Sequence, residues 1–156
     1  MKIILFSRED SRHLPDELAR VMNAIDVHGF DFVVNREFAP ILEQASGRQI
    51  DGSQIYDEGA IFEQQEAIMV CCGGDGTLLE GARRLHGKRI PVVGINSGRL
   101  GFLTAVAGDG IEQLFCDIAE QKLRIEERSM LTVEGSIPQS EAQLPALNEV
   151  ALQRHG

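Results

Sequence analysis

The chain has 156 residues, which suits one domain, or one domain followed by part of a second. It carries 24 acidic and 15 basic residues, and the net charge of -9 would repel phosphate backbones and anionic lipid surfaces. The charge therefore argues against nucleic-acid and membrane partners. The only apolar run near the start, at residues 3–6, is too short for an export signal or a membrane-spanning helix, so we expect a cytoplasmic location.

The three cysteines agree with that location. Cys71 and Cys72 are adjacent in a strand-like run, so their side chains are expected to point to opposite faces of a sheet. Cys116 lies in a segment of helical period. The sequence contains no CxxC pair or other metal-ligand spacing. We therefore expect all three to be reduced packing residues, and we predict no metal site built by the protein.

Short, continuous apolar runs alternate with longer segments of helical period along most of the chain. This alternation predicts an α/β fold, with an open and mostly parallel sheet covered by helices on both faces. The stretch 45–65 is polar and acidic and offers few apolar anchors, so we expect a mobile or poorly packed excursion there. Before it, the predicted elements are a strand at 3–6, a helix at 14–27, a strand at 30–34 and a short helix at 38–44.

After that stretch the pattern resumes with AIMVCC at 67–72, which is apolar on both alternating faces, as in a central buried strand. Three further elements are expected: a helix at 77–85, a strand at 90–95 and a helix at about 111–121 with Asp109 as its candidate cap. From 124 to 156 strand-like pieces follow without further alternation. We therefore place a domain boundary near Glu127.

The segment GGDGT at 73–77 follows the buried strand and leads into a helix, which places it at the sheet edge where open α/β folds bind ligands. Its glycines would let backbone N–H groups approach a phosphate or sugar closely, and Asp75 adds an acceptor. The segment is not the GxGxxG fingerprint, and no GxxxxGKS or GxxxxGKT motif occurs. The alternative interpretation is a tight strand-to-helix turn, with Asp75 near the positive end of the helix dipole.

Three motifs in order resemble those of NAD kinases. GGDG followed by Thr, Ser or Asn after a buried strand marks a superfamily of NAD kinases, diacylglycerol and sphingosine kinases and 6-phosphofructokinases. The stretch GINSGRLGFLT at 94–104 resembles the GxNxGxLGFLT segment of NAD kinases, and NEV at 148–150 lies where that family carries an Asn-Glu or Asn-Asp pair. Lipid kinases instead tend to carry NEV on the helix after GGDGT, which here reads LLEGARRL. The resemblance covers residues 67–153.

The resemblance implies a kinase that transfers a phosphoryl group from ATP or polyphosphate, with Mg²⁺ or another divalent metal, to the adenosine-ribose 2′-hydroxyl of NAD, giving NADP. It implies a catalytic role for Asp75, as a base, an orienting group or a metal-linked group. A homo-oligomer built through a second domain is also implied. The residues it assigns to substrate binding are Gly73, Gly74, Gly76, Thr77, Asn96, Phe102, Asn148 and Glu149. Arg99 is a further candidate, for a phosphate contact, because it lies in the loop after a strand and so at the ligand edge of the sheet.

The family continues into a β-rich second domain with a segment like TPTGSTAY, which this sequence does not contain. We therefore expect a nucleotide-binding α/β domain at 1–127, an incomplete start of the second domain at 128–156, and a truncated chain that is inactive alone. Two alternatives stay open. A lipid or sugar-phosphate kinase of the superfamily would share GGDGT without needing GINSGRLGFLT, and a non-catalytic nucleotide-binding module would keep the glycine loop but lack a closing domain.

A basic group lies where the helix after GGDGT ends. Cations stabilise the C-terminus of a helix, and this end is expected at the edge of the sheet opposite Asp75. We therefore predict that these side chains face solvent and take no part in phosphate binding. The group consists of Arg83, Arg84, His86, Lys88 and Arg89.

Overall fold

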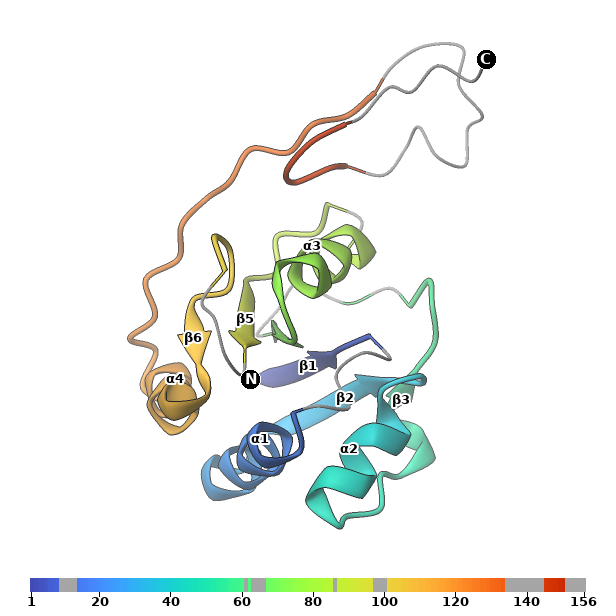
Figure 1. Ribbon diagram of the computed structural model, residues 1–156, viewed down its shortest axis with the longest axis vertical. Coiled ribbons are helices and arrows are strands. Elements are labelled where there is room, and N and C mark those ends of the chain that lie inside the picture. Colours follow the sequence, from blue (N-terminus) through green and yellow to red (C-terminus); the bar gives the residue numbers. More distant parts are fainter. Residues whose placement is uncertain are drawn as a thin grey trace.

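The computed structural model describes residues 1–8, 14–60, 62, 67–85, 87–96, 101–133 and 145–150. Within these residues six strands form one parallel sheet in the order β3-β2-β1-β4-β5-β6, which confirms the predicted α/β fold (Figure 1). The strands are β1 (Lys2–Phe6), β2 (Asp31–Asn35), β3 (Ile55–Tyr56), β4 (Ala67–Cys72), β5 (Val92–Asn96) and β6 (Val106–Ala107). The helices are α1 (Pro15–His28), α2 (Ala39–Ser46), α3 (Asp75–Arg84) and α4 (Ile111–Ala119).

Helices cover both faces of the sheet, as the alternating pattern predicts (Figure 1). On one face α1, α2 and α4 share a core with Leu5, Val70 and Phe115, and on the other face α3 packs over Phe6. The adjacent cysteines follow the alternation, because Cys72 belongs to the first core and Cys71 to the second. Both thiols are free and buried, and burial raises the pKa of each, as expected for packing residues.

The close contact of α3 with the sheet depends on Gly81. A Cβ atom at this position would lie 2.5 Å from Sγ of Cys71 and 3.1 Å from both Sδ of Met69 and Cδ1 of Phe6. An interior packed this closely has no room for an added methyl group. The backbone of α3 therefore lies directly on β1 and β4, and its first turn is held at the carboxyl end of β4.

The strand order places a topological switch point between β1 and β4. From β1 the chain builds one side of the sheet through β2 and β3, and it then returns to add β4 on the other side of β1. Open α/β sheets bind ligands in the crevice outside the carboxyl ends of the strands at such a point. Here those ends are Ser7, which follows β1, and the GGDGT turn, which follows β4.

The stretch 45–65 is better packed than its composition indicates, and the predicted excursion is wrong for residues 50–56. Ile50 is buried, and a capping box from Asp51 closes the 3₁₀ turn η2 (Gly52–Gln54). The short strand β3 then pairs with β2, and the hydroxyl of Tyr56 donates to the carbonyl of Leu5 at 3.1 Å. A few anchors are enough here because they attach directly to strands that are already buried.

Helix α4 is confirmed close to its predicted bounds, and its predicted packing residues, including Leu114 and Phe115, are buried. The predicted cap is wrong. The chain first passes through the 3₁₀ turn η3 (Gly108–Gly110), so Asp109 lies ahead of the N-cap position, which Gly110 occupies without a side-chain hydrogen bond. None of the helices in the described ranges combines the length and apolar character needed to cross a membrane.

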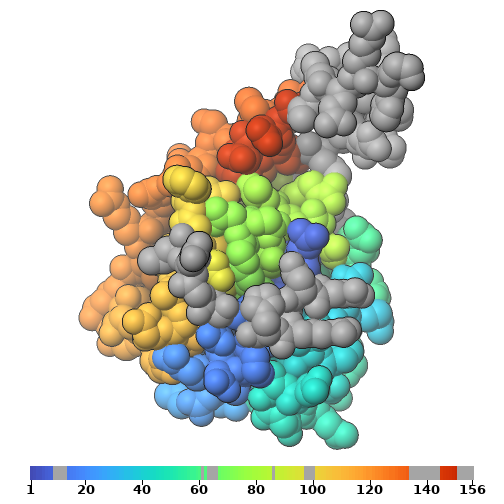
Figure 2. Space-filling model, in the orientation of Figure 1, coloured from blue at the N-terminus to red at the C-terminus, as the bar shows by residue number. Residues whose placement is uncertain are grey.

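After α4 the described chain runs to residue 133 without a helix or a strand, and residues 145–150 lie beside it. An antiparallel bridge joins Leu131 and Ala146, whose N–H groups each donate to the other carbonyl at 2.8 Å. Figure 2 shows these orange and red segments at the end of the molecule where the green α3 lies. Strand-like pieces are predicted for 124–156. Among the described residues of this stretch, the bridge between Leu131 and Ala146 is the strand-like pairing that the structure shows. The division into domains stays a prediction.

Candidate functional site

The GGDGT segment forms a tight turn from β4 into α3. Gly73 has φ +149°, and its N–H donates to the carbonyl of Ile95 on β5 at 2.8 Å. A Cβ atom on Gly73 would lie 2.5 Å from Oγ1 of Thr77, whose side chain is buried below the turn. Gly74 is the N-cap residue, so α3 begins at Asp75, two residues earlier than predicted. Glycine is thus required at position 73 by both the backbone conformation and the available space.

The carboxylate of Asp75 binds the end of the GINSGRLGFLT stretch. Its oxygens accept backbone N–H bonds from Phe102 at 2.9 Å, Leu103 at 3.2 Å and Thr104 at 3.0 Å. These bonds fix residues 101–104, which we call the pinned turn, against the first turn of α3. Two of the resemblance motifs, 27 to 29 residues apart in sequence, are therefore joined by one side chain.

Two glycines make this contact possible. A Cβ atom on Gly101 would lie 2.0 Å from Oδ1 of Asp75, and a Cβ atom on Gly94 would lie 2.8 Å from Cγ2 of Thr104. Thr104 is buried, and its Oγ1 accepts the N–H bond of Gly101 at 2.8 Å. Glycine at positions 94 and 101 thus has a steric reason, because Gly94 makes room for the side chain of Thr104 and Gly101 makes room for the carboxylate of Asp75. Gly98 lies outside the described residues.

Phe102 lies at the tip of the pinned turn with its side chain fully exposed. A large apolar side chain held in solvent by a fixed backbone is a candidate for stacking on a base. Asn96 ends β5 and is half-buried, at the same edge of the sheet. The predicted contribution of Arg99 lies outside the described residues.

The hydrogen bonds to Asp75 also set its ionisation. Desolvation raises the pKa of this carboxyl. The backbone N–H bonds from Thr104, Leu103 and Phe102, together with the Thr104 side chain, lower the pKa by more than desolvation raises it, so the pKa lies below its ordinary value of 3.8. Asp75 is therefore ionised at neutral pH. A carboxylate with a lowered pKa is a weak base and a good acceptor for fixed donors.

We expect the pinned turn to loosen in acid. Because the folded-state pKa is lowered, ionised Asp75 stabilises the turn above the ordinary value of 3.8, and this contribution is lost as the pH falls through the lower folded value. A titration of the Asp75 carboxyl carbon by NMR should give a midpoint below 3.8, with the amide signals of Phe102 to Thr104 following it. The transition should vanish in Asp75→Asn. A midpoint at or above 3.8 would contradict the assigned hydrogen bonds.

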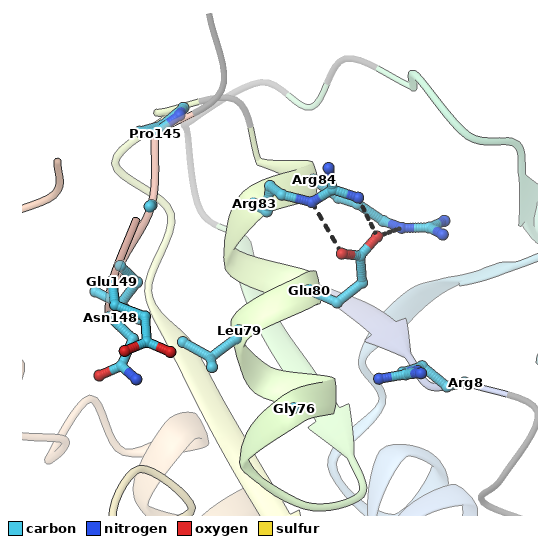
Figure 3. A pocket seen from close by; sticks show the side chains of 11 residues that line it. Arg8, Gly76, Leu79, Glu80, Arg83, Arg84, Pro145, Asn148 and Glu149 are labelled. Atoms are coloured by element: carbon cyan, nitrogen blue, oxygen red, sulfur yellow. Dashed lines mark hydrogen bonds and ion pairs between the residues drawn. The ribbon is translucent and has the colours of Figure 1, made fainter. Parts of the chain in front are cut away.

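An open pocket of about 480 Å³ runs along α3 (Figure 3). It brings three of the predicted binding residues together, because Gly76 lies at one end and Asn148 and Glu149, both exposed, lie across from α3. The side chains of Asp75, Phe102 and Asn96 do not line it. The residues that line the pocket are Arg8, Gly76, Leu79, Glu80, Arg83, Arg84, Pro145, Ala146, Leu147, Asn148 and Glu149.

The prediction that the basic group faces solvent is wrong for Arg84, whose side chain is 19% exposed and whose guanidinium lies 4.9 Å from the centre of the Phe6 ring. Arg83 and Arg84 both bind Glu80, at 2.9 and 3.0 Å. Both arginines line the pocket, because positions 76, 80, 83 and 84 fall on one face of the short helix. That spacing is visible in the sequence. His86 lies outside the described residues, and Lys88 and Arg89 are exposed.

The comparisons with known proteins identify the family of the chain. Residues 3–123 match the model of the ATP-NAD kinase N-terminal domain, so the chain belongs to the NAD kinase family. It is 32% identical over 152 residues to an NAD kinase of Bacteroides fragilis, covering 97% of this chain and 51% of that protein. It is 34% identical over 155 residues to an NAD kinase of Coxiella burnetii, covering 97% of this chain and 48% of that protein.

The fold is similar to a crystal structure of yeast NADH kinase complexed with NADH, with a TM-score of 0.58 and 15% sequence identity. The match covers 94% of this chain and 46% of the yeast chain. At this identity the likeness establishes the fold alone. The chain spans about half the length of the curated relatives it matches.

Proposed function

We propose that the protein transfers a phosphoryl group from ATP or another phosphoanhydride to the adenosine-ribose 2′-hydroxyl of NAD, giving NADP. Membership of the NAD kinase family supports this reaction. The observation that carries it is the contact of Asp75 with the pinned turn, which joins the GGDGT and GINSGRLGFLT motifs at the switch point of the sheet. Small-molecule nucleotides are the expected partners, and we propose a homo-oligomer in the cytoplasm.

We assign Asp75 an orienting role. Phosphoryl transfer through a loose transition state depends mainly on positioning and on neutralisation of charge, so a strong base is not needed. Asp75 supplies a fixed anion that holds the pinned turn, and the turn presents Phe102 to a base. Asn148 and Glu149, on the wall of the pocket, supply an amide and a carboxylate suited to sugar hydroxyls.

Magnesium would depend largely on the nucleotide for its ligands. Among the described residues no group of three or more His, Cys, Asp or Glu is arranged to hold a metal ion. Mg²⁺ commonly uses one or two carboxylates together with substrate phosphates and water. The metal, when bound, would neutralise charge on the phosphates.

The test is NADP formation from NAD, ATP and Mg²⁺, measured with this chain and with the full-length product of its reading frame. Activity of the full-length protein supports the proposal, and comparison with this chain measures how much residues 1–156 contribute. Binding of ATP and NAD is measured in parallel by calorimetry. Folded full-length protein that binds nucleotide but forms no NADP would contradict the proposal and favour another acceptor or a binding module.

A further inference from the structure

Arg8 lines the pocket but lies outside the three motifs that the sequence contains. It lies two residues after β1, whose last residue, Phe6, pairs with Cys71 of β4. It therefore lies at the switch point, beside the glycine turn. Its Nη1 atom is 3.5 Å from the place where a Cβ atom on Gly76 would be, so the guanidinium covers the first turn of α3.

The backbone before Arg8 is held from both sides. Ser7 is 1% exposed, and its hydroxyl donates to the carbonyl of Cys72, at the end of β4. On the other side, Asn35 at the end of β2 accepts the Ser7 N–H bond at 3.2 Å and donates to the Ser7 carbonyl at 3.3 Å. Asn35 is 2% exposed. A residue next to such a buried network starts from a fixed position, which reduces the entropy lost when its side chain binds a ligand.

The pocket has a cationic side and an acceptor-rich side. Figure 3 shows Arg8 on one side of α3 and Asn148 and Glu149 on the other, with Leu79 between them. At the far end of α3, Glu80 binds Arg83 and Arg84, two of the three arginines that line the pocket. Arg8 lines the Gly76 end of the pocket, next to the glycine turn.

We propose that Arg8 binds the phosphoanhydride of a nucleotide in this pocket, whose sugar faces Asn148 and Glu149. The inference rests on the proposed function and extends it to a residue outside the three motifs. A planar guanidinium can bind phosphate oxygens through two parallel hydrogen bonds. A volume of about 480 Å³ lies in the range of small-molecule sites, and Leu79 and Leu147 give the apolar contact that a sugar or base needs.

The experiment measures dissociation constants by calorimetry for wild type, Arg8→Gln and Arg8→Lys, each with ATP, NAD and inorganic tripolyphosphate. The matched control is Arg48→Gln, which removes the same charge from an exposed ion pair with Asp26 on α1. For Arg8→Gln we expect affinity for at least one of the two nucleotides to fall about tenfold or more, with partial recovery in Arg8→Lys. The nucleotide that is affected identifies whether the bound phosphates belong to the donor or to NAD.

Unchanged dissociation constants for ATP and NAD in folded Arg8→Gln, verified by circular dichroism, would overturn the inference, as would equal losses in Arg48→Gln. So would a wild-type protein that binds neither nucleotide. The proposed function is tested separately, by the assay of NADP formation. If nucleotide binding depends on Arg8 while the wild type makes no NADP, the proposed reaction is contradicted and the proposed phosphate site is supported.

Discussion

Asp75→Asn is expected to lower kcat/KM for NADP formation by the full-length protein on the order of 100-fold. An asparagine amide keeps one acceptor oxygen, but it turns a donor NH₂ group towards backbone N–H groups that bind the carboxylate in the wild type. The pinned turn would shift, and Phe102 would move with it. Displacements of about 1 Å are enough for losses of this size. Steady-state kinetics measure the effect, and unchanged turnover would remove the role assigned to Asp75.

Gly101→Ala tests the same contact from the other side without removing the carboxylate. The added Cβ atom would lie 2.0 Å from Oδ1 of Asp75, so the turn must move away. If Asp75 acts by holding the turn, this variant should lose a comparable share of activity. The matched control is Gly52→Ala, because a Cβ atom at Gly52 meets no atom within 4 Å. Full activity in Gly101→Ala would mean that the position of the turn does not matter.

Gly81→Ala is expected to lower the free energy of unfolding by about 2 kcal/mol, although alanine is the better helix former. The methyl group would meet Sγ of Cys71 at 2.5 Å and would force α3 away from β4. Overpacking of this kind outweighs the gain of about 1 kcal/mol in helix propensity. Urea unfolding followed by far-UV circular dichroism measures the change in the free energy of unfolding.

Gly76→Ala is the internal control for this prediction, because it makes the same substitution in the same helix. Gly76 is exposed, and the nearest atom to an added Cβ is Nη1 of Arg8 at 3.5 Å, an ordinary contact. The variant should unfold at the same urea concentration as wild type or at a higher one. Equal behaviour of the two variants would show that α3 can shift on the sheet at little cost.

The central strands could be predicted from the sequence because both of their faces are buried. AIMVCC is apolar at every position, which leaves β4 as the natural interpretation, and its predicted bounds are those of the structure. The GGDGT turn could be located for the same reason, since it follows this run directly. The helices shift by one or two residues at their ends, where the last turn has little sequence signal.

The edge strands and the pocket could not be predicted in this way. β3 and β6 have two residues each, too few for any periodicity to show. The pocket depends on residues 145–149 lying beside α3, a contact between segments about 65 residues apart that no local pattern specifies. The sequence signal for Arg8 is its position two residues after the first strand, which does not by itself indicate a binding residue.

The strand order also has a consequence during synthesis. Lys2 of β1 pairs with Asp31 of β2, but its partner on the other side is Ala67 of β4. At roughly 5–20 residues per second, several seconds of translation separate β1 from β4. Throughout that interval the backbone N–H and C=O groups on the edge of β1 that later pairs with β4 have no strand beside them. This edge is therefore the part of the nascent chain that most needs protection from association with other chains.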